Sequence, residues 1–264
     1  MNISVVIPMY NSQDTIIDAL ESIKYQTKLS FVKEIIVVND GSTDESLEIL
    51  KKYKKSNSKL PITIIDKHNG GVSTARNKGI ERAKSKWIAL LDSDDEWKRN
   101  KLEYQKNIID NNPQIDFLGG PYNNKKLKIL WKKIDYLYQP NVKEICIKNF
   151  PQPSTVIFKR KIYDEMGGFD ENQRYAEDGN YFVKICNRYN FYYDPKLLIT
   201  YDGGKRGFGE RGLSSNLEEM HKGNLKNIKE FKDLNIIDKK FYMFLKGFYI
   251  LKYWRRIFLT KFIN

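Results

Sequence analysis

Short apolar runs alternate with segments of helical period through the first 95 residues. The runs predict strands and the periodic segments predict helices, because side chains alternate across a strand but repeat every three to four positions on a helix. Residues 35–38 and 87–91 are apolar at every position, which is typical of parallel strands buried on both faces. The pattern predicts an α/β fold, a doubly wound, mostly parallel sheet flanked by helices. We expect strands at 3–7, 34–38, 62–65 and 87–91, and helices at 15–26, 44–55 and 72–84.

The remaining sequence mixes the two patterns less regularly. Residues 127–138 are aromatic and basic and receive no assignment. From residue 218 onward the sequence has no strand signal and is dense in Lys and aromatic residues, so we expect a helical C-terminal segment. Between these regions we expect helices at 98–111, 161–166 and 177–189, strands at 117–120 and 154–159, and a turn at 167–170.

The composition indicates a folded protein with an anionic partner. Of 264 residues, 46 are Lys or Arg and 33 are Asp or Glu, which gives a net charge of +13. Such an excess favours nucleic acid, an acidic membrane surface or a phosphorylated substrate. The 17 Tyr, 14 Phe and 4 Trp residues supply large apolar areas for a core, which argues against a disordered chain.

Cysteine usage and the first residues favour a cytoplasmic location. Cys146 and Cys186 lie far apart, with no spacing typical of a metal site or a disulfide framework. Residues 1–8 carry no basic region, and their apolar run is too short for a signal peptide. The sequence also lacks the roughly 18 to 20 consecutive apolar residues that span a bilayer, so we expect any membrane contact to be peripheral.

Polar residues follow three of the expected strands, and the third group is the most informative. Ligands of α/β sheets collect at the carboxyl ends of the strands. Asp92, Asp94 and Asp95 follow the fourth strand within four positions. Carboxylates this close raise one another's pKa unless a cation neutralises them, and Mg²⁺ or Mn²⁺ prefers such oxygen ligands. The alternative is a solvated helix N-terminus, where acidic residues meet the positive end of the helix dipole.

Two further positions fit a nucleotide ligand. Asp40 ends the second strand, where a carboxylate can accept hydrogen bonds from a ring N–H or a hydroxyl, although the Gly-Ser-Thr that follows also fits a tight turn and helix cap. Gly70 and Gly71 precede the helix that carries Arg76, so the backbone can approach a pyrophosphate there. The segment matches neither a Walker A loop nor GxGxxG, which argues against kinases and Rossmann dehydrogenases.

Taken together, the motifs resemble the inverting, GT-A type glycosyltransferases of family 2, in particular the bacterial enzymes that build cell-surface oligosaccharides. The resemblance spans roughly residues 2–205 and implies a GT-A fold. It implies a nucleotide-sugar-binding half at 1–95, an acceptor-binding half at 96–215 and a basic, amphipathic helical segment at 216–264. The matching pieces are VVIPMYN at 5–11, VVNDGSTD at 37–44, GVSTARN at 71–77, LDSDD at 91–95, GGFD at 167–170 and ED at 177–178.

The resemblance also implies roles for individual residues. Asp92 and Asp94 would form the DXD motif, with Asp94 as the direct ligand of Mn²⁺ or Mg²⁺ and Asp95 as a nearly equal candidate. Asp178 would be the general base, since a single displacement needs one carboxylate to take the proton of the acceptor hydroxyl. The nucleotide sugar, a UDP-hexose, would be bound by Pro8, Tyr10, Asn11, Asp40, Arg76, Asp92, Ser93, Asp94 and Glu177.

Two cationic segments complete the expected site. In the Gly- and Arg-rich loop at 205–212, Arg206 and Arg211 are expected to close over the diphosphate and exclude water. Residues 239–261 interleave Lys and Arg with aromatic residues, a pattern typical of a helix that lies on an anionic membrane and suits a lipid-linked acceptor. The alternative is a helical hairpin packed on the domain with its lysines in water.

Two competing functions follow from the same sequence. A nucleic-acid-binding protein would fit the net charge of +13, but none of the common motifs is present, so we expect no nucleic-acid partner. A non-catalytic glycan-binding relative is disfavoured because Asp92, Asp94 and Asp178 are retained. The expected partners are therefore a nucleotide sugar and a glycan or lipid-linked glycan acceptor, in the cytoplasm or at the inner face of its membrane. A homodimer is left open.

Overall fold

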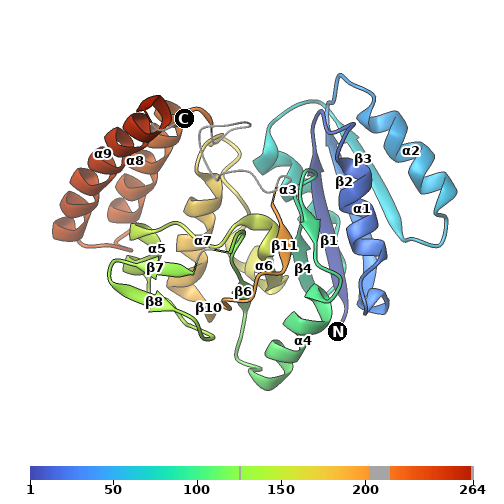
Figure 1. Ribbon diagram of the computed structural model, residues 1–264, viewed down its shortest axis with the longest axis horizontal. Helices are drawn as coiled ribbons and strands as arrows, with labels where there is room; N and C mark the ends of the chain where they lie inside the picture. The colour runs from blue at the N-terminus through green and yellow to red at the C-terminus, as the bar shows by residue number, and fades with distance from the viewer. Residues whose placement is uncertain (125, 202–214, 263–264) are drawn as a thin grey trace.

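The computed structural model describes residues 1–124, 126–201 and 215–262, and within them a central seven-stranded sheet organises the chain (Figure 1). β1 pairs in parallel with β2 and β4, and β2 with β3. Only β9 runs against its neighbours, β4 and β6, within this sheet as described. In spatial order the strands are β10 (Phe191–Tyr193), β6 (Phe117–Gly119), β9 (Ile157–Lys159), β4 (Trp87–Leu90), β1 (Ile3–Met9), β2 (Val32–Asp40) and β3 (Ile62–Lys67).

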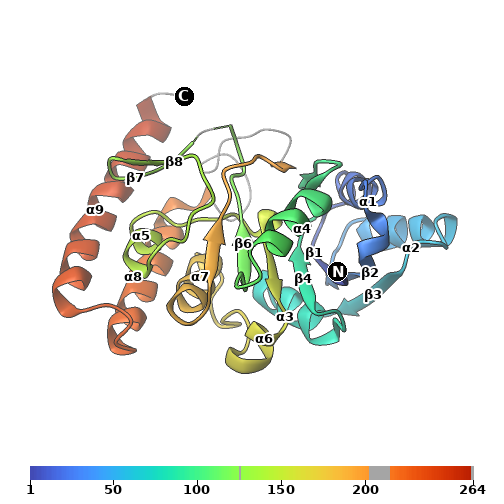
Figure 2. The same cartoon turned by 90° about the horizontal axis from the view of Figure 1, so that it is seen from below.

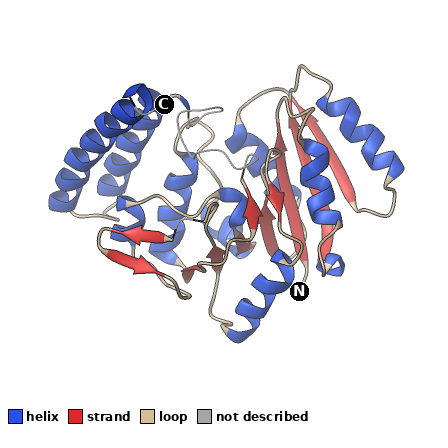
Figure 3. Ribbon diagram, in the orientation of Figure 1, coloured by secondary structure: helices blue, strands red, loops and turns tan. Residues whose placement is uncertain are grey.

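Helices cover both faces of the sheet, as Figure 3 shows, and the strands are buried on both sides. On one face Val5 and Ile7 pack in a core with Leu20 of α1 (Ile16–Lys24) and Leu50 of α2 (Ser46–Ser56). On the other face Val6 packs in a second core with residues of α3 (Val72–Arg82). Alternate residues of β1 therefore belong to different cores, as the two-fold periodicity of a strand requires.

The central part of the chain adds two small two-stranded sheets and several helices to the central sheet. β11 (Ile199–Thr200) pairs antiparallel with β5 (Glu96–Trp97), and β7 (Leu127–Ile129) forms a hairpin with β8 (Lys132–Ile134). The helices of this part are α4 (Lys101–Asn111), α5 (Val142–Ile147), α6 (Lys161–Met166) and α7 (Glu177–Arg188), with the short 3₁₀ turn η2 (Pro153–Thr155). A second 3₁₀ turn, η1 (Leu29–Phe31), lies earlier in the chain, between α1 and β2.

The last two helices, α8 (Leu217–Asp233) and α9 (Lys239–Phe262), lie side by side at the end of the molecule opposite α2 (Figures 1 and 2). They share a core with the rest of the chain, because Ile228, Phe231 and Leu245 are buried in the same cluster as Val6. The Tyr249 hydroxyl also donates a 2.7 Å hydrogen bond to the Cys146 carbonyl. In the ranges described, no helix combines the length and the apolar character needed to cross a bilayer.

The predicted α/β class is confirmed, and most predicted elements end within a few residues of the observed ones. One strand is shorter than predicted: residues 153–155 form η2, and β9 begins at Ile157. The cause is local, since the Gln152 side chain caps the turn by accepting a hydrogen bond from the Ser154 N–H and Pro153 fits the first position of a helical turn. The unassigned stretch 127–138 contains the β7–β8 hairpin.

Candidate active site

One large cavity, of about 1660 Å³, opens at the carboxyl ends of β1, β2 and β4. Parallel strands end at the same edge of a sheet, so segments far apart in the sequence meet there. The cavity wall contains the predicted residues Pro8, Tyr10, Asn11, Asp40, Arg76, Asp92, Ser93, Asp94, Glu177 and Asp178. Arg206 and Arg211 lie outside the described residues, and the buried Asp95 is not part of the described wall.

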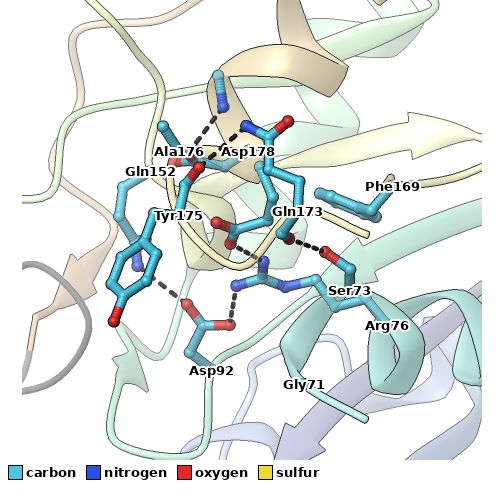
Figure 4. A network of polar contacts seen from close by, with 12 residues as sticks. Gly71, Ser73, Arg76, Asp92, Gln152, Phe169, Gln173, Tyr175, Ala176 and Asp178 are labelled. Carbon is cyan, nitrogen blue, oxygen red and sulfur yellow. Dashed lines mark hydrogen bonds and ion pairs between the residues drawn. The ribbon is translucent and has the colours of Figure 1, made fainter. Parts of the chain in front are cut away.

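The centre of this site is the guanidinium of Arg76, which joins three segments (Figure 4). Arg76 on α3 is 3% exposed, and its Nη2 lies 2.8 Å from Asp92 Oδ1 while its Nη1 lies 2.9 Å from Glu177 Oε1. Burial alone would lower the pKa of Arg76, but the carboxylates of Asp92 and Glu177 outweigh it and raise that pKa. The guanidinium is therefore permanently charged and fixes the end of β4 against the start of α7.

The loop before α7 is held by the C-terminal helix α8. Ala176 adopts a left-handed conformation (φ 57°), which is uncommon for a residue with a Cβ and persists where the surroundings impose it. Asn227 on α8 donates to the Ala176 carbonyl at 2.8 Å and accepts from Gln173 Nε2 at 2.7 Å. From the other side, Ser73 Oγ donates to the Gln173 carbonyl at 3.3 Å. This network presents the side chains of Glu177 and Asp178 to the cavity.

The carboxylates that follow β4 point in different directions. Asp95 is 1% exposed, and its Oδ2 accepts hydrogen bonds from Ser154 Oγ at 2.5 Å and Gln152 Nε2 at 2.9 Å. Asp92 pairs with Arg76, whereas Asp94 is exposed and lines the cavity. Throughout the described ranges, no three His, Cys, Asp or Glu side chains are grouped as a ready metal cage. Asp94 is thus the most exposed carboxylate of the motif in the cavity, while Asp95 bonds to the η2 turn.

The end of the cavity next to β2 is shaped by Asp40. Its Oδ1 accepts from the Gly70 N–H at 2.9 Å and its Oδ2 from the Gly71 N–H at 2.7 Å, while Lys67 Nζ forms an ion pair with it. Gly71 has φ 90° and ψ 166°, a conformation that is essentially restricted to glycine, so the turn before α3 requires this residue. Tyr10, which is 49% exposed, lines the same cavity.

Asp178 is a half-buried carboxylate whose pKa is raised by its surroundings. Its Oδ1 accepts from the Gly179 N–H at 2.7 Å and from Asn149 Nδ2 at 3.5 Å. Burial raises the pKa of Asp178, and the carboxylate of Asp92 adds to the rise. Burial and the charge of Asp178 likewise raise the pKa of Glu177, against the opposing effect of Arg76. A carboxylate with a raised pKa is a stronger base than a solvated one.

Several residues of the site were not predicted from the sequence. Gln152 and Ser154 hold the carboxylate turn, Asn149 contacts Asp178, and Asn227 holds the loop before α7. Isolated amides and hydroxyls carry no spacing signal, so sequence patterns offer no means of finding them. Three buried polar atoms of this region lack a hydrogen-bond partner among the described residues, namely Arg76 Nε, Asn149 Oδ1 and Gln173 Oε1. Buried polar groups are normally hydrogen-bonded, and all three of these residues line the cavity.

Comparison with known proteins agrees with this geometry. The family model described as Glycosyl transferase family 2 matches residues 4–188, which carry β1 through α7 and every described residue of the predicted donor and base sites. The chain belongs to glycosyl transferase family 2. A family member from Rickettsia prowazekii, the uncharacterized glycosyltransferase RP339, is 32% identical over 207 residues, which cover 75% of this chain and 62% of that protein.

Other members of the family match shorter stretches. The putative teichuronic acid biosynthesis glycosyltransferase TuaG of Bacillus subtilis is 41% identical over 103 residues, which cover 39% of this chain and 40% of that protein. The poly(ribitol-phosphate) beta-glucosyltransferase of Bacillus spizizenii is 44% identical over 95 residues, covering 36% and 15%. The chain thus spans less than two thirds of the length of these relatives.

Solved structures confirm the GT-A fold. Residues 1–349 of TarS from S. aureus superpose with a TM-score of 0.71 at 20% identity, over 100% of this chain and 76% of that one. The mannosyltransferase PcManGT of Pyrobaculum calidifontis, solved in complex with GDP-Man and Mn2+, superposes with a TM-score of 0.69 at 15% identity, over 95% and 73%.

Replacement of Arg76 by Met tests the ion pairs at the centre of the site. We expect Arg76→Met to lower the free energy of unfolding by about 3–5 kcal/mol in a urea titration, because it leaves the buried Glu177 carboxylate unpaired. Adding Glu177→Gln to this variant should recover part of the loss. Lys78→Met is the control: this residue lies on the same helix in an exposed ion pair with Glu81, so the change should stay within about 0.5 kcal/mol. An equal effect of the two Met variants would contradict the central role of Arg76.

Proposed function

We propose that this family 2 member transfers a glycosyl group from a nucleotide sugar, a UDP-hexose, to a hydroxyl of a glycan acceptor, with inversion at the anomeric carbon. The observation that carries the proposal is the Arg76 bridge. It joins Asp92 to Glu177, and their neighbours, the exposed Asp94 and the half-buried Asp178, line one cavity beside the glycine turn held by Asp40. A donor site and a base are thereby side by side.

The donor assignment rests on the edge of β1 and β2. Tyr10 offers an exposed ring for stacking on a base, and Asp40 Oδ2, which accepts from the Gly71 N–H, has a second lone pair for a ring N–H or a ribose hydroxyl. TarS, whose fold is shared, has been solved in complex with UDP and with UDP-GlcNAc. These observations support a uridine nucleotide as the donor of this chain.

The residues present fit a divalent ion bound together with the donor. Mg²⁺ and Mn²⁺ sites for nucleotide substrates use one or two carboxylates, with phosphate oxygens and water completing the shell. Asp94, exposed in the cavity, would hold the ion, with Asp92 beside it; the buried Asp95 would support the turn. When bound, such an ion stabilises the negative charge of the departing nucleoside diphosphate.

Proton removal falls to Asp178. In a single displacement, the acceptor oxygen bonds to the anomeric carbon as the bond to the diphosphate breaks, and the hydroxyl proton passes to Asp178 Oδ. Arg76 holds Glu177 and Asp92 in fixed positions in the cavity, so the groups around the reaction are oriented before the substrates arrive. Inversion follows from attack on the face opposite the leaving group.

The names of the relatives support the proposed acceptor, and the surface of α9 supports a location at the membrane. TuaG and the poly(ribitol-phosphate) beta-glucosyltransferase carry names of cell-wall polymer synthesis, which supports a cell-surface or lipid-linked glycan acceptor made at the cytoplasmic face of the membrane. α9 exposes a row of large apolar side chains next to exposed cations such as Lys246 and Arg255, which supports peripheral binding to an anionic bilayer. The exposed apolar residues are Met243, Phe244, Ile250, Leu251, Trp254 and Phe258.

The metal assignment predicts different outcomes for two neighbouring carboxylates. Asp94→Asn should raise the Mn²⁺ concentration needed for half-maximal UDP binding by about tenfold or more, because one charged ligand is lost. Asp95→Asn should leave that concentration unchanged and lower the free energy of unfolding by about 1–3 kcal/mol, because the partners of Asp95 are buried. UDP binding by calorimetry and urea unfolding measure the two effects. Undiminished UDP release in EDTA would rule out the metal.

The base assignment predicts both a loss and a pH dependence. Asp178→Asn should reduce glycosyl transfer by about 10²- to 10⁴-fold with UDP affinity retained. The base works ionised, so transfer should fall as the pH drops through its pKa, and burial places this acid limb above the ordinary Asp value near 4. Asp164→Asn, an exposed position on α6, is the control and should be neutral. If the loss of activity at low pH persists in Asp178→Asn, protonation of another group causes it, and the base assignment is contradicted.

If the protein binds membranes through α9, the exposed side chains of this helix should determine its affinity for anionic vesicles. The protein should float with vesicles rich in phosphatidylglycerol and much less with pure phosphatidylcholine, and Ile250→Ser with Trp254→Ser should reduce recovery, because both side chains are exposed. Tyr25→Ser, an exposed aromatic at the end of α1, serves as the control. Equal recovery of all variants, or no dependence on anionic lipid, would contradict the proposal.

A further inference from the structure

Four cations gather on the wall of the cavity formed by α9 and by the residues just after α5. They are Lys148, Lys252, Arg255 and Arg256. Within the described part of the chain, no carboxylate forms an ion pair with Lys148, Lys252 or Arg255. The amino group of Lys148 instead donates to the Lys128 carbonyl at 3.2 Å. We call these four residues the cationic wall.

Lys252 is the most constrained member of the cationic wall. It is half-buried, and its amino group lies 5.1 Å from the ring centroid of Tyr249 and 5.8 Å from that of Phe248. Burial, together with the smaller effects of the charges of Arg256 and Lys148, lowers the pKa of Lys252 to about 7. Burial and Lys128 also lower the pKa of Lys148. Like charges held this close are unfavourable without an anion between them, and an anion bound there would relieve the repulsion.

The cationic wall adjoins Asp178 through α9. Tyr249, which adjoins Lys252 along α9, bonds to Cys146, and the carboxylate of Asp178 contributes to the raised pKa of its hydroxyl. Asp40, proposed to bind the donor, ends β2, which Figure 1 shows in the half of the molecule away from α9. A ligand group on the wall therefore belongs to the substrate that approaches Asp178 from the acceptor side.

We propose that the cationic wall binds a phosphate group of the acceptor, so that the acceptor of this enzyme is a phosphate-bearing glycan rather than a neutral one. This rests on the proposed function, because it names the substrate class of the same cavity. Lysine and arginine side chains form charge-assisted hydrogen bonds to phosphate oxygens, whereas neutral sugars are bound by aromatic faces and uncharged polar groups. The phosphate is supplied either by a phosphodiester-linked polyol polymer or by the diphosphate of a lipid carrier.

Binding to the intact protein, with UDP and Mn²⁺ saturating the donor site, tests the inference. The probes are a glycerol-phosphate oligomer, which stands for the polymer, and farnesyl diphosphate, which stands for the lipid carrier; glycerol and farnesol are their phosphate-free counterparts. We expect calorimetry to show binding of one phosphate-bearing probe and not of its counterpart, weakening as salt rises. The probe that binds identifies the source of the phosphate.

Substitutions in the cationic wall test whether the phosphate-bearing probe binds there. Lys252→Met and Lys148→Met should each weaken binding of that probe about tenfold, the usual cost of one hydrogen bond to a charged group. Lys252→Arg should retain most of the affinity, because the charge and the donors remain. Lys246→Met removes an exposed lysine of the same helix that does not line the cavity, and it should have no effect. UDP affinity should be unchanged in all variants, which also shows that they fold.

Three results would overturn the inference. Failure of both probes to bind in the presence of UDP would do so, as would equal losses in Lys252→Met and Lys246→Met. Weaker UDP binding in Lys252→Met or Lys148→Met would assign the wall to the donor diphosphate instead. Failure of the proposed function is separate: it would appear as the absence of UDP binding or of UDP release from a UDP-hexose in the unaltered protein, whereas failure of this inference leaves both intact.

Discussion

The ion pairs of Arg76 are the interaction on which the arrangement of the cavity depends. One buried guanidinium reaches Asp92 at the end of β4 and Glu177 at the start of α7, and so joins the two halves of the site. A buried charge pair stabilises a fold weakly relative to an apolar contact, but removal of either partner leaves a charge in a low-dielectric interior. The bridge thus restricts the positions that these segments can take relative to each other.

The charges around this bridge separate into two regions. Carboxylates border the end of the cavity near β2 and β4, and cations border the end near α9. Asp178, half-buried and with a raised pKa, lines the same cavity. Under the proposed function, this separation would help to orient the two substrates, since a metal-bound diphosphate would be drawn to the first region and an anionic group of the acceptor to the second. Part of the net charge of +13 therefore comes from cations that line the cavity.

The sequence predicted those parts of the site that follow directly from strand ends. Asp40, Asp92 and Asp94 were predicted because parallel strands deliver their carboxyl ends to one edge, and Asp178 because its motif resembles a known family. Patterning could not predict that Arg76 meets Glu177, 101 positions away, or that Asp95 turns from the ligand toward Ser154. Those choices depend on side-chain direction and on tertiary hydrogen bonds. The cations of α9 were read as a membrane surface, yet Lys252 and Arg256 also line the cavity.

The Asn227 side chain sets a boundary for protein engineering. It belongs to α8, beyond the segment matched by the family model, yet it donates to the carbonyl of Ala176 and so supports the backbone that carries Glu177 and Asp178. A chimera that exchanges the strand-rich part between relatives must therefore transfer α8 together with the loop at 173–176. A junction at residue 216 would separate a backbone carbonyl from its donor and expose the apolar surface that Ile228 and Phe231 cover.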